Sequence, residues 1–410
     1  MAGRFNDNPM KQKPVKVLFL TSDSSAVAGV GPCLADALEN MDMSFIDPIV
    51  VCPWEEQGAA TILPRVQSLG LPFLVRDLGK WMTAPSNYGW GHLRAFLGGL
   101  KNRVWSLASL IEREHIDLVY TNGLPCIEGA LAARLTKRPH IWHLHEAIRN
   151  NPDLRSYVPA WLVEEMVGRL SASVIVNSNF LASELKRTAR LAPIHIVHNG
   201  VDVTESMVVS PILVGVEVRR ELGIELDAPI VLAVGTVAPR KGYSTLIKAA
   251  SLVLGQYPNT TFLVAGAEVP EHAIELRLLV EQLGISNKFR FLGPRLDIPR
   301  LLAAADIFVH SAHQETFGRV LVEAMASGKP VVATCSGGPQ EIVVESVTGY
   351  LVPIDGIQNM AERMTELLLS DELRSCLGEA GKQRAYEHFS VRHYASEIQN
   401  ILLAAGKDVN

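Results

Sequence analysis

The sequence predicts an α/β fold built from two Rossmann-like domains, each with a parallel sheet. Three observations support this prediction. With 410 residues, the chain is long for a single globular core. Short apolar runs rich in strand-forming residues alternate with helical stretches, which is typical of parallel sheets. The alternation occurs in two series, and segment 199–223 between them has little periodic order.

The first series begins with the apolar run VKVLFL, followed by a loop and a helix from about residue 32 to 40. Its further strands are expected at residues 46–52, 118–121, 140–144 and 173–177. The second series has expected strands at residues 230–235, 261–266, 289–292, 307–310, 331–334 and 350–352.

We therefore expect a domain boundary near residue 205, with domains at 1–205 and 206–391. A last helix, at about 392–404, follows a break at Phe389 and Ser390 and is expected to pack back on the first domain. Open α/β sheets bind ligands beyond the carboxyl ends of their strands, and clefts between domains are preferred ligand sites. Functional residues should therefore lie in loops that follow strands.

Composition narrows the class of protein. Hydrophobic residues make up 48% and charged residues 20% of the chain, which is typical of a globular protein. The formal charge of −5 provides no basic field for nucleic acid. Five scattered cysteines show no metal or redox spacing and favour a reducing cytoplasm. Residues 1–13 lack an apolar signal region and no stretch reaches bilayer length, so we expect a soluble or peripheral protein.

The densest cluster of candidate site residues lies between residues 305 and 343. A strand ends there, SAHQETFG forms a loop, and a helix begins at about Arg319. Glu315 lies in the loop and Glu323 in the helix, while Gly318 lets the backbone approach a ligand closely. Unpaired N–H groups at the helix start suit an anionic phosphate. Taken alone, each glutamate also fits a helix-start carboxylate or a solvated helix face.

The segment also fits a family pattern. It reads ETFGRVLVEAMASGKPVVAT and is followed by Gly337, Gly338 and Glu341. This pattern resembles the retaining glycosyltransferases of family four, also known as glycosyl transferases group 1, whose two-domain fold is the GT-B type. The resemblance extends over most of the chain and is strongest over residues 229–353.

The resemblance implies roles for these residues. Glu315 would contact hydroxyls of the transferred sugar and Glu323 the ribose of the nucleotide, because carboxylates accept hydrogen bonds from vicinal hydroxyls. Backbone near the sugar and diphosphate would come from Phe317, Gly318, Arg319 and Val320.

A second candidate site is the loop TVAPRKG after the first strand of the second series. An adjacent Arg-Lys pair is often only a solvated surface pair. The resemblance implies that Lys241 neutralises the diphosphate, which leaves as an anion when the sugar bond breaks. The chain departs from many family members by having Thr236 where they carry an arginine, and Arg240 is the neighbouring cation.

Two further candidates lie in the first domain. Gly29 and Gly31 form half of a GxGxxG pattern, which is either an ordinary turn or, by the resemblance, backbone that faces the donor phosphate. In IWHLHE, alternation places His143 and His145 on the same strand face. Such histidines are often simply packed, but the resemblance implies that His145 lies beside the reacting sugar.

Together with these residues, the resemblance implies a metal-independent hexosyltransferase. The chain contains no Asp-x-Asp pair to anchor a divalent ion and no phosphate-binding GxxxxGK[ST] loop. We expect no cofactor, a UDP- or GDP-sugar as donor, and a glycan, lipid-linked or small-molecule acceptor. By the resemblance, His145, Lys241 and Glu315 are the catalytic candidates. The alternatives are a nucleotide-sugar epimerase or hydrolase of the same fold, or a non-catalytic nucleotide-sugar-binding partner.

One stretch of the sequence has no role in the candidate site. Residues 92–113 mix Leu, Phe and Trp with Arg and Lys at helical spacing. This pattern fits a peripheral contact with an anionic, cytoplasmic membrane face. It also fits an ordinary amphipathic helix packed on the first domain, which is favoured because Gly98 and Gly99 interrupt it.

Overall fold

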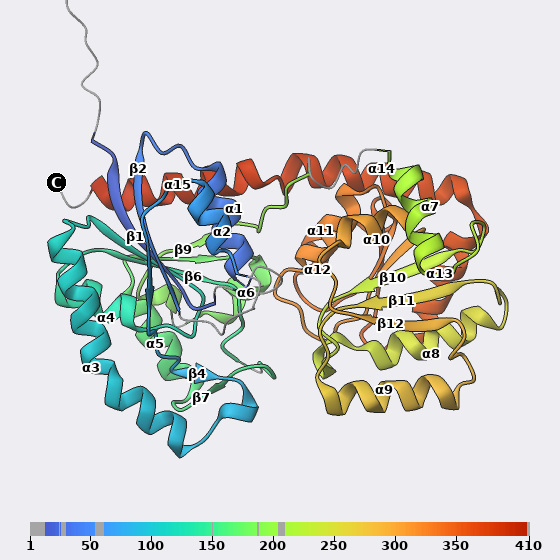
Figure 1. Ribbon diagram of the computed structural model, residues 1–410, viewed down its shortest axis with the longest axis horizontal. Helices are drawn as coiled ribbons and strands as arrows, with labels where there is room; N and C mark the ends of the chain where they lie inside the picture. Colours follow the sequence, from blue (N-terminus) through green and yellow to red (C-terminus); the bar gives the residue numbers. More distant parts are fainter. Residues whose placement is uncertain are drawn as a thin grey trace, which may run out of the picture.

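The computed structural model describes residues 13–23, 25, 30–53, 61–149, 151–186, 188–203 and 210–407. It contains two parallel sheets that lie in two halves of the molecule, side by side in Figure 1. We call the part around the first sheet the first half and the part around the second sheet the second half. The predicted domain boundary near residue 205 lies outside the described residues.

The first half contains a seven-stranded parallel sheet of order β3-β2-β1-β5-β6-β8-β9. Its strands are β1 (Val15–Thr21), β2 (Ile46–Pro53), β3 (Phe73–Arg76), β5 (Leu118–Asn122), β6 (His140–Leu144), β8 (Ser173–Val176) and β9 (Ile194–Ile196). Its helices are α1 (Gly31–Asn40), α2 (Leu63–Ser68), α3 (Trp90–Arg113), α4 (Glu128–Leu135), α5 (Ala160–Leu170) and α6 (Asn179–Glu184). A short antiparallel pair, β4 (Met82–Thr83) and β7 (Arg155–Ser156), lies apart from the sheet.

The second half contains a six-stranded parallel sheet of order β12-β11-β10-β13-β14-β15. Its strands are β10 (Ile230–Val234), β11 (Thr261–Ala265), β12 (Phe289–Gly293), β13 (Ile307–His310), β14 (Val331–Thr334) and β15 (Gly349–Val352). Its helices are α7 (Pro211–Glu221), α8 (Tyr243–Leu254), α9 (Pro270–Gln282), α10 (Ile298–Ala304), α11 (Arg319–Ala326), α12 (Pro339–Ile342), α13 (Ile357–Leu369) and α14 (Asp371–His388).

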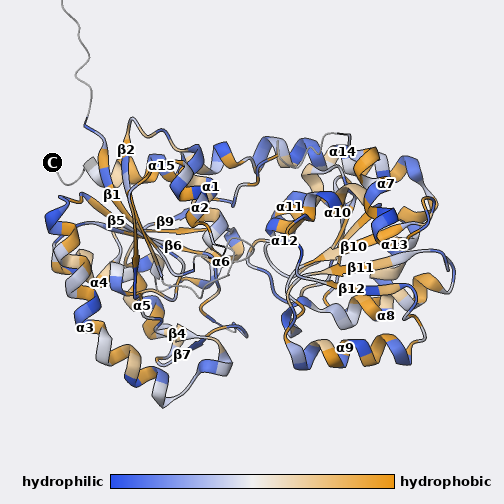
Figure 2. Ribbon diagram, viewed as in Figure 1, coloured by the Kyte–Doolittle hydropathy of each residue, from blue (hydrophilic) through white to orange (hydrophobic). Residues whose placement is uncertain are grey.

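The apolar runs of the sequence form the buried strands of both sheets, which are mostly orange in Figure 2. Strands buried on both faces need nearly continuous hydrophobic sequence, which explains why these runs could be recognised. All the strands expected in the two series are present, so the predicted α/β class with two parallel sheets is confirmed.

The weakly periodic segment between the two series contains a helix that the sequence did not predict. This helix, α7, packs against α10. The Arg219 guanidinium donates to the Ala304 carbonyl at 3.0 Å and pairs with Asp306 at 2.9 Å. The α7 sequence PILVGVEVRRE is rich in β-branched residues and has a low intrinsic helix propensity. Tertiary packing therefore decides its conformation.

The last helix, α15 (Val391–Lys407), follows α14 after the break at Phe389 and Ser390. The two helices run along one side of both halves in Figure 1. α15 contacts α1 and β1, and its buried Tyr394, Ile398 and Leu402 join the core of the first half. Within the described residues, none of the helices combines the length and apolar character needed to cross a membrane.

We predict that truncating α15 at its buried face destabilises the protein. Ile398 is fully buried, so Ile398→Ala should lower the free energy of unfolding by about 2–5 kcal/mol. The control Asn400→Ala, at an exposed position of the same helix, should change it by less than about 0.5 kcal/mol. Urea unfolding followed by circular dichroism measures both. Equal stability of the two variants would contradict the packing of α15 described here.

Candidate active site

A cleft of about 750 Å³ lies between the two halves and is lined by residues of both. In the second sheet, the strand order changes direction between β10 and β13, and the loops after these two strands form one wall. Such switch points are where open α/β sheets bind ligands. The predicted site residues that line the cleft are His145, Arg240, Lys241, Glu315, Phe317, Gly318, Arg319, Val320 and Glu323.

Of the glycine pair predicted after β1, the structure describes Gly31. Gly29 lies outside the described residues. Gly31 is the first residue of α1 and is buried, and it is not among the residues that line the cleft. Its neighbours Val30 and Pro32 do line it, so the start of α1 still faces the second half.

At the floor of the cleft, Lys241 and Glu315 form an ion pair. Nζ of Lys241 lies 2.5 Å from Oε2 of Glu315, and both side chains are about one-tenth exposed. The Nε2 atom of His310 lies 3.3 Å from the same carboxylate oxygen, and a guanidinium nitrogen of Arg240 lies 3.7 Å from it. Burial alone raises the pKa of Glu315, but Lys241, His310 and Arg240 together hold this pKa well below its usual range. Glu315 is therefore a carboxylate.

Two glycines bring these loops together. Gly242, after Lys241, has φ +62°, and a Cβ there would lie 2.0 Å from the Ser311 carbonyl oxygen. Gly338 donates its N–H to the Glu315 carbonyl at 2.8 Å, and a Cβ on it would lie within 2.3 Å of Phe317. The Gly-Gly pair of the sequence motif thus packs directly against the loop that carries Glu315.

The start of α11 forms the next part of the wall. Gly318 has φ +106° and turns the chain into the helix after the buried Phe317. The first N–H groups of a helix have no intrahelical partner, so those of Arg319 and Val320 are available to an anion. One turn further, Glu323 accepts a hydrogen bond from Nε of Arg319 at 3.2 Å. Burial raises the pKa of Glu323, and the charge of Arg319 partly opposes this.

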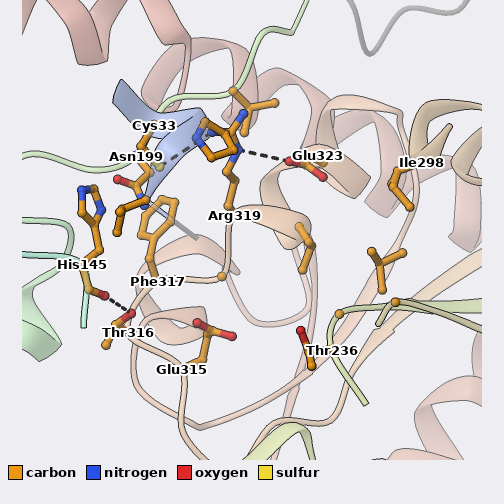
Figure 3. Close-up of a pocket in the computed structure, with 18 of the residues that line it drawn as sticks. Cys33, His145, Asn199, Thr236, Ile298, Glu315, Thr316, Phe317, Arg319 and Glu323 are labelled. Carbon is orange, nitrogen blue, oxygen red and sulfur yellow. Dashed lines mark hydrogen bonds and ion pairs between the residues drawn. The ribbon is translucent and has the colours of Figure 1, made fainter. Parts of the chain in front are cut away.

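Arg319 also reaches across the cleft, which the sequence did not predict. A terminal guanidinium nitrogen lies 2.6 Å from the carboxylate of Asp36 on α1. The side chain of Arg319 also points towards Cys33, as Figure 3 shows. Asp36 pairs in addition with Arg65 at 2.6 Å. A carboxylate within the otherwise apolar stretch LADAL of α1 was the available sequence signal for this buried acid.

A second contact across the cleft involves His145. The Thr316 hydroxyl donates to the His145 carbonyl oxygen at 2.8 Å (Figure 3). The His145 ring lies 2.9 Å from the Asn122 side-chain oxygen, and its centroid is 4.1 Å from that of His143, in agreement with their predicted shared face. Burial and the charge of Arg319 lower the pKa of His145 to about 3, so its ring is neutral at neutral pH.

Glu341, the last residue of the predicted motif, joins the two halves beside the cleft. Its carboxylate accepts from the backbone N–H groups of Asn179 and Phe180, both at 2.8 Å, and lies 3.1 Å from His198. Partial burial raises the pKa of Glu341, but these hydrogen bonds outweigh burial and lower it to about 2. This residue of the motif therefore connects the two halves of the molecule.

Comparison with known proteins identifies similar chains. The family model described as "Glycosyl transferases group 1" matches residues 216–384, and "Glycosyltransferase Family 4" matches residues 29–205. The chain is 30% identical to alpha-maltose-1-phosphate synthase from Mycobacterium tuberculosis, over 67% of this chain and 75% of that protein. It is 34% identical to the lipopolysaccharide core biosynthesis glycosyltransferase LpsE from Rhizobium meliloti, over 42% of this chain and 49% of LpsE.

Among solved structures, HepE from Anabaena in complex with UDP and glucose is similar. Its TM-score is 0.78 at 24% sequence identity, with 95% of this chain and all of that chain covered. This similarity concerns the fold and extends over both halves.

We predict that Glu341 makes stability depend on pH. Because its folded-state pKa of about 2 is below the usual value of 4.5, its stabilisation is present above pH 4.5 and is lost as pH falls towards 2. Glu341→Gln should therefore show a shallower loss of unfolding free energy between pH 5 and 3 than the wild type. Denaturant titrations at several pH values measure this slope, and parallel slopes would contradict the assignment.

Proposed function

Because the chain belongs to the glycosyl transferases group 1 family and has its GT-B fold, we propose a retaining transfer of a sugar from a UDP- or GDP-sugar to an acceptor. The acceptor class comprises glycans, lipid-linked sugars and small molecules. The proposal rests on one observation: Lys241, Glu315, the α11 N-terminus and Glu323 lie together in one wall of the cleft. HepE, which shares this fold, was solved with UDP and glucose, which supports a nucleotide-sugar donor.

The charges of the two walls support the placement of the substrates. Among the described residues that line the cleft, the second half contributes four cations, Arg240, Lys241, Arg295 and Arg319, and two acids, Glu315 and Glu323. The first half contributes mainly carboxyl groups and one cation: Asp36, Glu39, Glu146, Asp153, Asp202 and Arg65. A diphosphate is therefore attracted to the second-half wall, and the acceptor hydroxyls find hydrogen-bond acceptors on the first-half wall.

On the second-half wall, the ribose, the diphosphate and the sugar of the donor contact different residues. The ribose hydroxyls donate to Glu323, and the diphosphate lies at the N-terminus of α11, where the helix dipole and free N–H groups favour an anion. The sugar lies at the loop of Glu315, whose ionised carboxylate accepts from its hydroxyls.

Lys241 acts on the leaving group. It is paired with Glu315, and when the donor binds, the diphosphate would take Lys241 and the sugar hydroxyls would take Glu315. The charge of the diphosphate grows as the sugar bond breaks, and a fixed ammonium stabilises that charge most in the transition state. Arg240 lies close enough to add a second charge, where Thr236 replaces the family arginine. Fixed cations and the helix dipole therefore stabilise the leaving diphosphate without a metal ion.

The first half positions the acceptor. Retention requires that the acceptor attacks from the face that the diphosphate leaves. Thr316 and His145 connect the sugar loop to the first-half wall, and the neutral His145 ring can hydrogen-bond a sugar hydroxyl without adding charge. Closure of the two halves excludes water, which would otherwise compete with the acceptor.

Two alternative functions would use the same cleft. An epimerase or hydrolase would release a rearranged or free sugar without an acceptor. A non-catalytic partner would bind the nucleotide sugar and leave it intact, and Thr236 would then mark lost catalysis. Lys241, Glu315 and Glu323 together in one wall favour the transferase. Product analysis by NMR after incubation with donor separates all three.

A thermal-shift screen against UDP, GDP, ADP and their sugar conjugates tests donor binding. A ligand that binds only the native state raises the melting temperature as its concentration exceeds its Kd. We expect stabilisation by a uracil or guanine nucleotide, unchanged by a chelator. No shift across the panel would contradict a nucleotide-sugar site, and a shift that requires metal would contradict the metal-free mechanism.

We predict that Lys241→Ala lowers kcat about 100-fold or more, because it removes charge stabilisation that is greatest in the transition state. The control Lys248→Ala, at an exposed position of α8, should leave kcat unchanged. Steady-state kinetics at saturating donor measure both, and a melting curve confirms that the variant is folded. An unchanged kcat in folded Lys241→Ala would refute the role.

We predict that Glu323→Ala weakens nucleotide binding. Loss of hydrogen bonds from the ribose to a carboxylate should raise the Kd for the nucleoside diphosphate about 10-fold or more. Glu362→Ala, at an exposed position of α13, is the matched control. Isothermal titration calorimetry measures both affinities, and normal binding by Glu323→Ala would mean that the ribose lies elsewhere.

A further inference from the structure

The exposed face of α3 is unusually apolar for a solvated helix. Trp90 is 78% exposed, Leu97 56% and Trp105 55%. These positions are spaced by seven and eight residues, so they lie along one stripe of the helix. Single exposed apolar residues are common, but two exposed tryptophans and a leucine in one stripe are not explained by packing within the chain.

The same stripe has positive charge and no acid. Arg94 and Lys101 are exposed between the apolar side chains. Glu112, in the last turn, is the first acidic residue of α3. Beside the helix, Asp77 lies 3.9 Å from Arg103, while Lys80 and Arg76 are exposed. We call Trp90, Arg94, Leu97, Lys101 and Trp105 the α3 stripe.

An adjoining face of α3, together with its C-terminal turns, holds the helix on the molecule. α3 packs on α4, and most of its buried residues lie near its C-terminal end: Phe96, Leu107, Ala108, Leu110 and Ile111. The sequence suggested that Gly98 and Gly99 interrupt this helix, but α3 is continuous through both. The interruption expected at Gly98 and Gly99 is therefore wrong, and one continuous helix presents both a packed face and a separate apolar face.

We propose that the α3 stripe docks on an anionic lipid bilayer. Tryptophan is enriched at membrane interfaces, where its apolar ring enters the acyl boundary and its N–H stays at the headgroups. Arg94 and Lys101 complement anionic headgroups, and the absence of acids between Trp90 and Trp105 removes repulsion. An anionic bilayer fits both the charge and the aromatic character of the stripe.

The fold connects this stripe to the cleft. The Tyr157 hydroxyl lies 3.1 Å from His92 and also contacts the backbone of Gly89, at the start of α3. The Tyr157 ring stacks on Tyr88 with centroids 4.6 Å apart. Tyr157 follows β7 directly, and residues 151–154 before β7 line the cleft. In terms of the proposed function, a bilayer at Trp90 would bring a lipid-linked acceptor towards the first-half wall.

Co-sedimentation with vesicles tests the docking. The full chain is spun with vesicles of phosphatidylcholine alone and of phosphatidylcholine with phosphatidylglycerol at 3:1. We expect binding to the anionic vesicles only, weakened by 0.5 M NaCl because part of the attraction is electrostatic. Absence of binding to the anionic vesicles, or equal binding to both compositions, overturns the proposal.

Variants assign the binding to α3. Trp90→Ser/Trp105→Ser should lower the partition coefficient about 10-fold or more, and Arg94→Gln/Lys101→Gln about 5-fold per cation. The matched control Ile274→Ser/Leu278→Ser removes two exposed apolar residues, 60% and 52% exposed, from α9 in the second half. Unchanged binding of the α3 variants, or an equal loss in the control, overturns the assignment. Nucleotide-induced thermal shifts of the same variants report on the donor site separately and should equal those of the wild type.

Discussion

The ion pair between Lys241 and Glu315 constrains the geometry of the second-half wall. Both side chains are nearly buried, so removing either partner would leave a charge in a poorly solvated site, which costs several kcal/mol. The loops after β10 and β13 must therefore approach closely, and Gly242 provides the space for this approach. Gly338 lets the loop after β14 pack against the loop that carries Glu315. We propose that the donor replaces this pair: the diphosphate binds Lys241 and the sugar hydroxyls bind Glu315.

Contacts between the halves depend on the same loops. Thr316, next to Glu315, bonds to the first-half strand end at His145, and Arg319 at the start of α11 pairs with Asp36. Glu341 binds the start of α6, and α15 returns to the first sheet. Because Arg319 bonds both Asp36 and Glu323, a donor ribose at Glu323 would compete with Arg319 and alter the contact between the halves. Donor binding and closure would thereby be coupled through one side chain.

Much of the fold could be predicted from the sequence because its strands are buried on both faces and read as apolar runs. Short edge strands such as β3 and β9 lack a long apolar run, and α7 lacks helix propensity, so these were missed. The candidate residues after β10 and β13 could be recognised because each group is contiguous in sequence. Their partners Asp36 and Asp153 are distant in sequence, and only the folded chain brings them to Arg319 and Arg240. The chemical roles of all these residues remain predictions.

The central claim is that the donor binds the second-half wall through Lys241, the α11 N-terminus and Glu323. A crystal structure of the protein with the nucleoside diphosphate sugar that stabilises it most tests this claim directly. We predict that the diphosphate lies against Lys241 and the backbone of Arg319 and Val320, with the ribose at Glu323. A nucleotide bound to the first-half wall, or a Lys241–Glu315 pair left intact beside the bound donor, would contradict it.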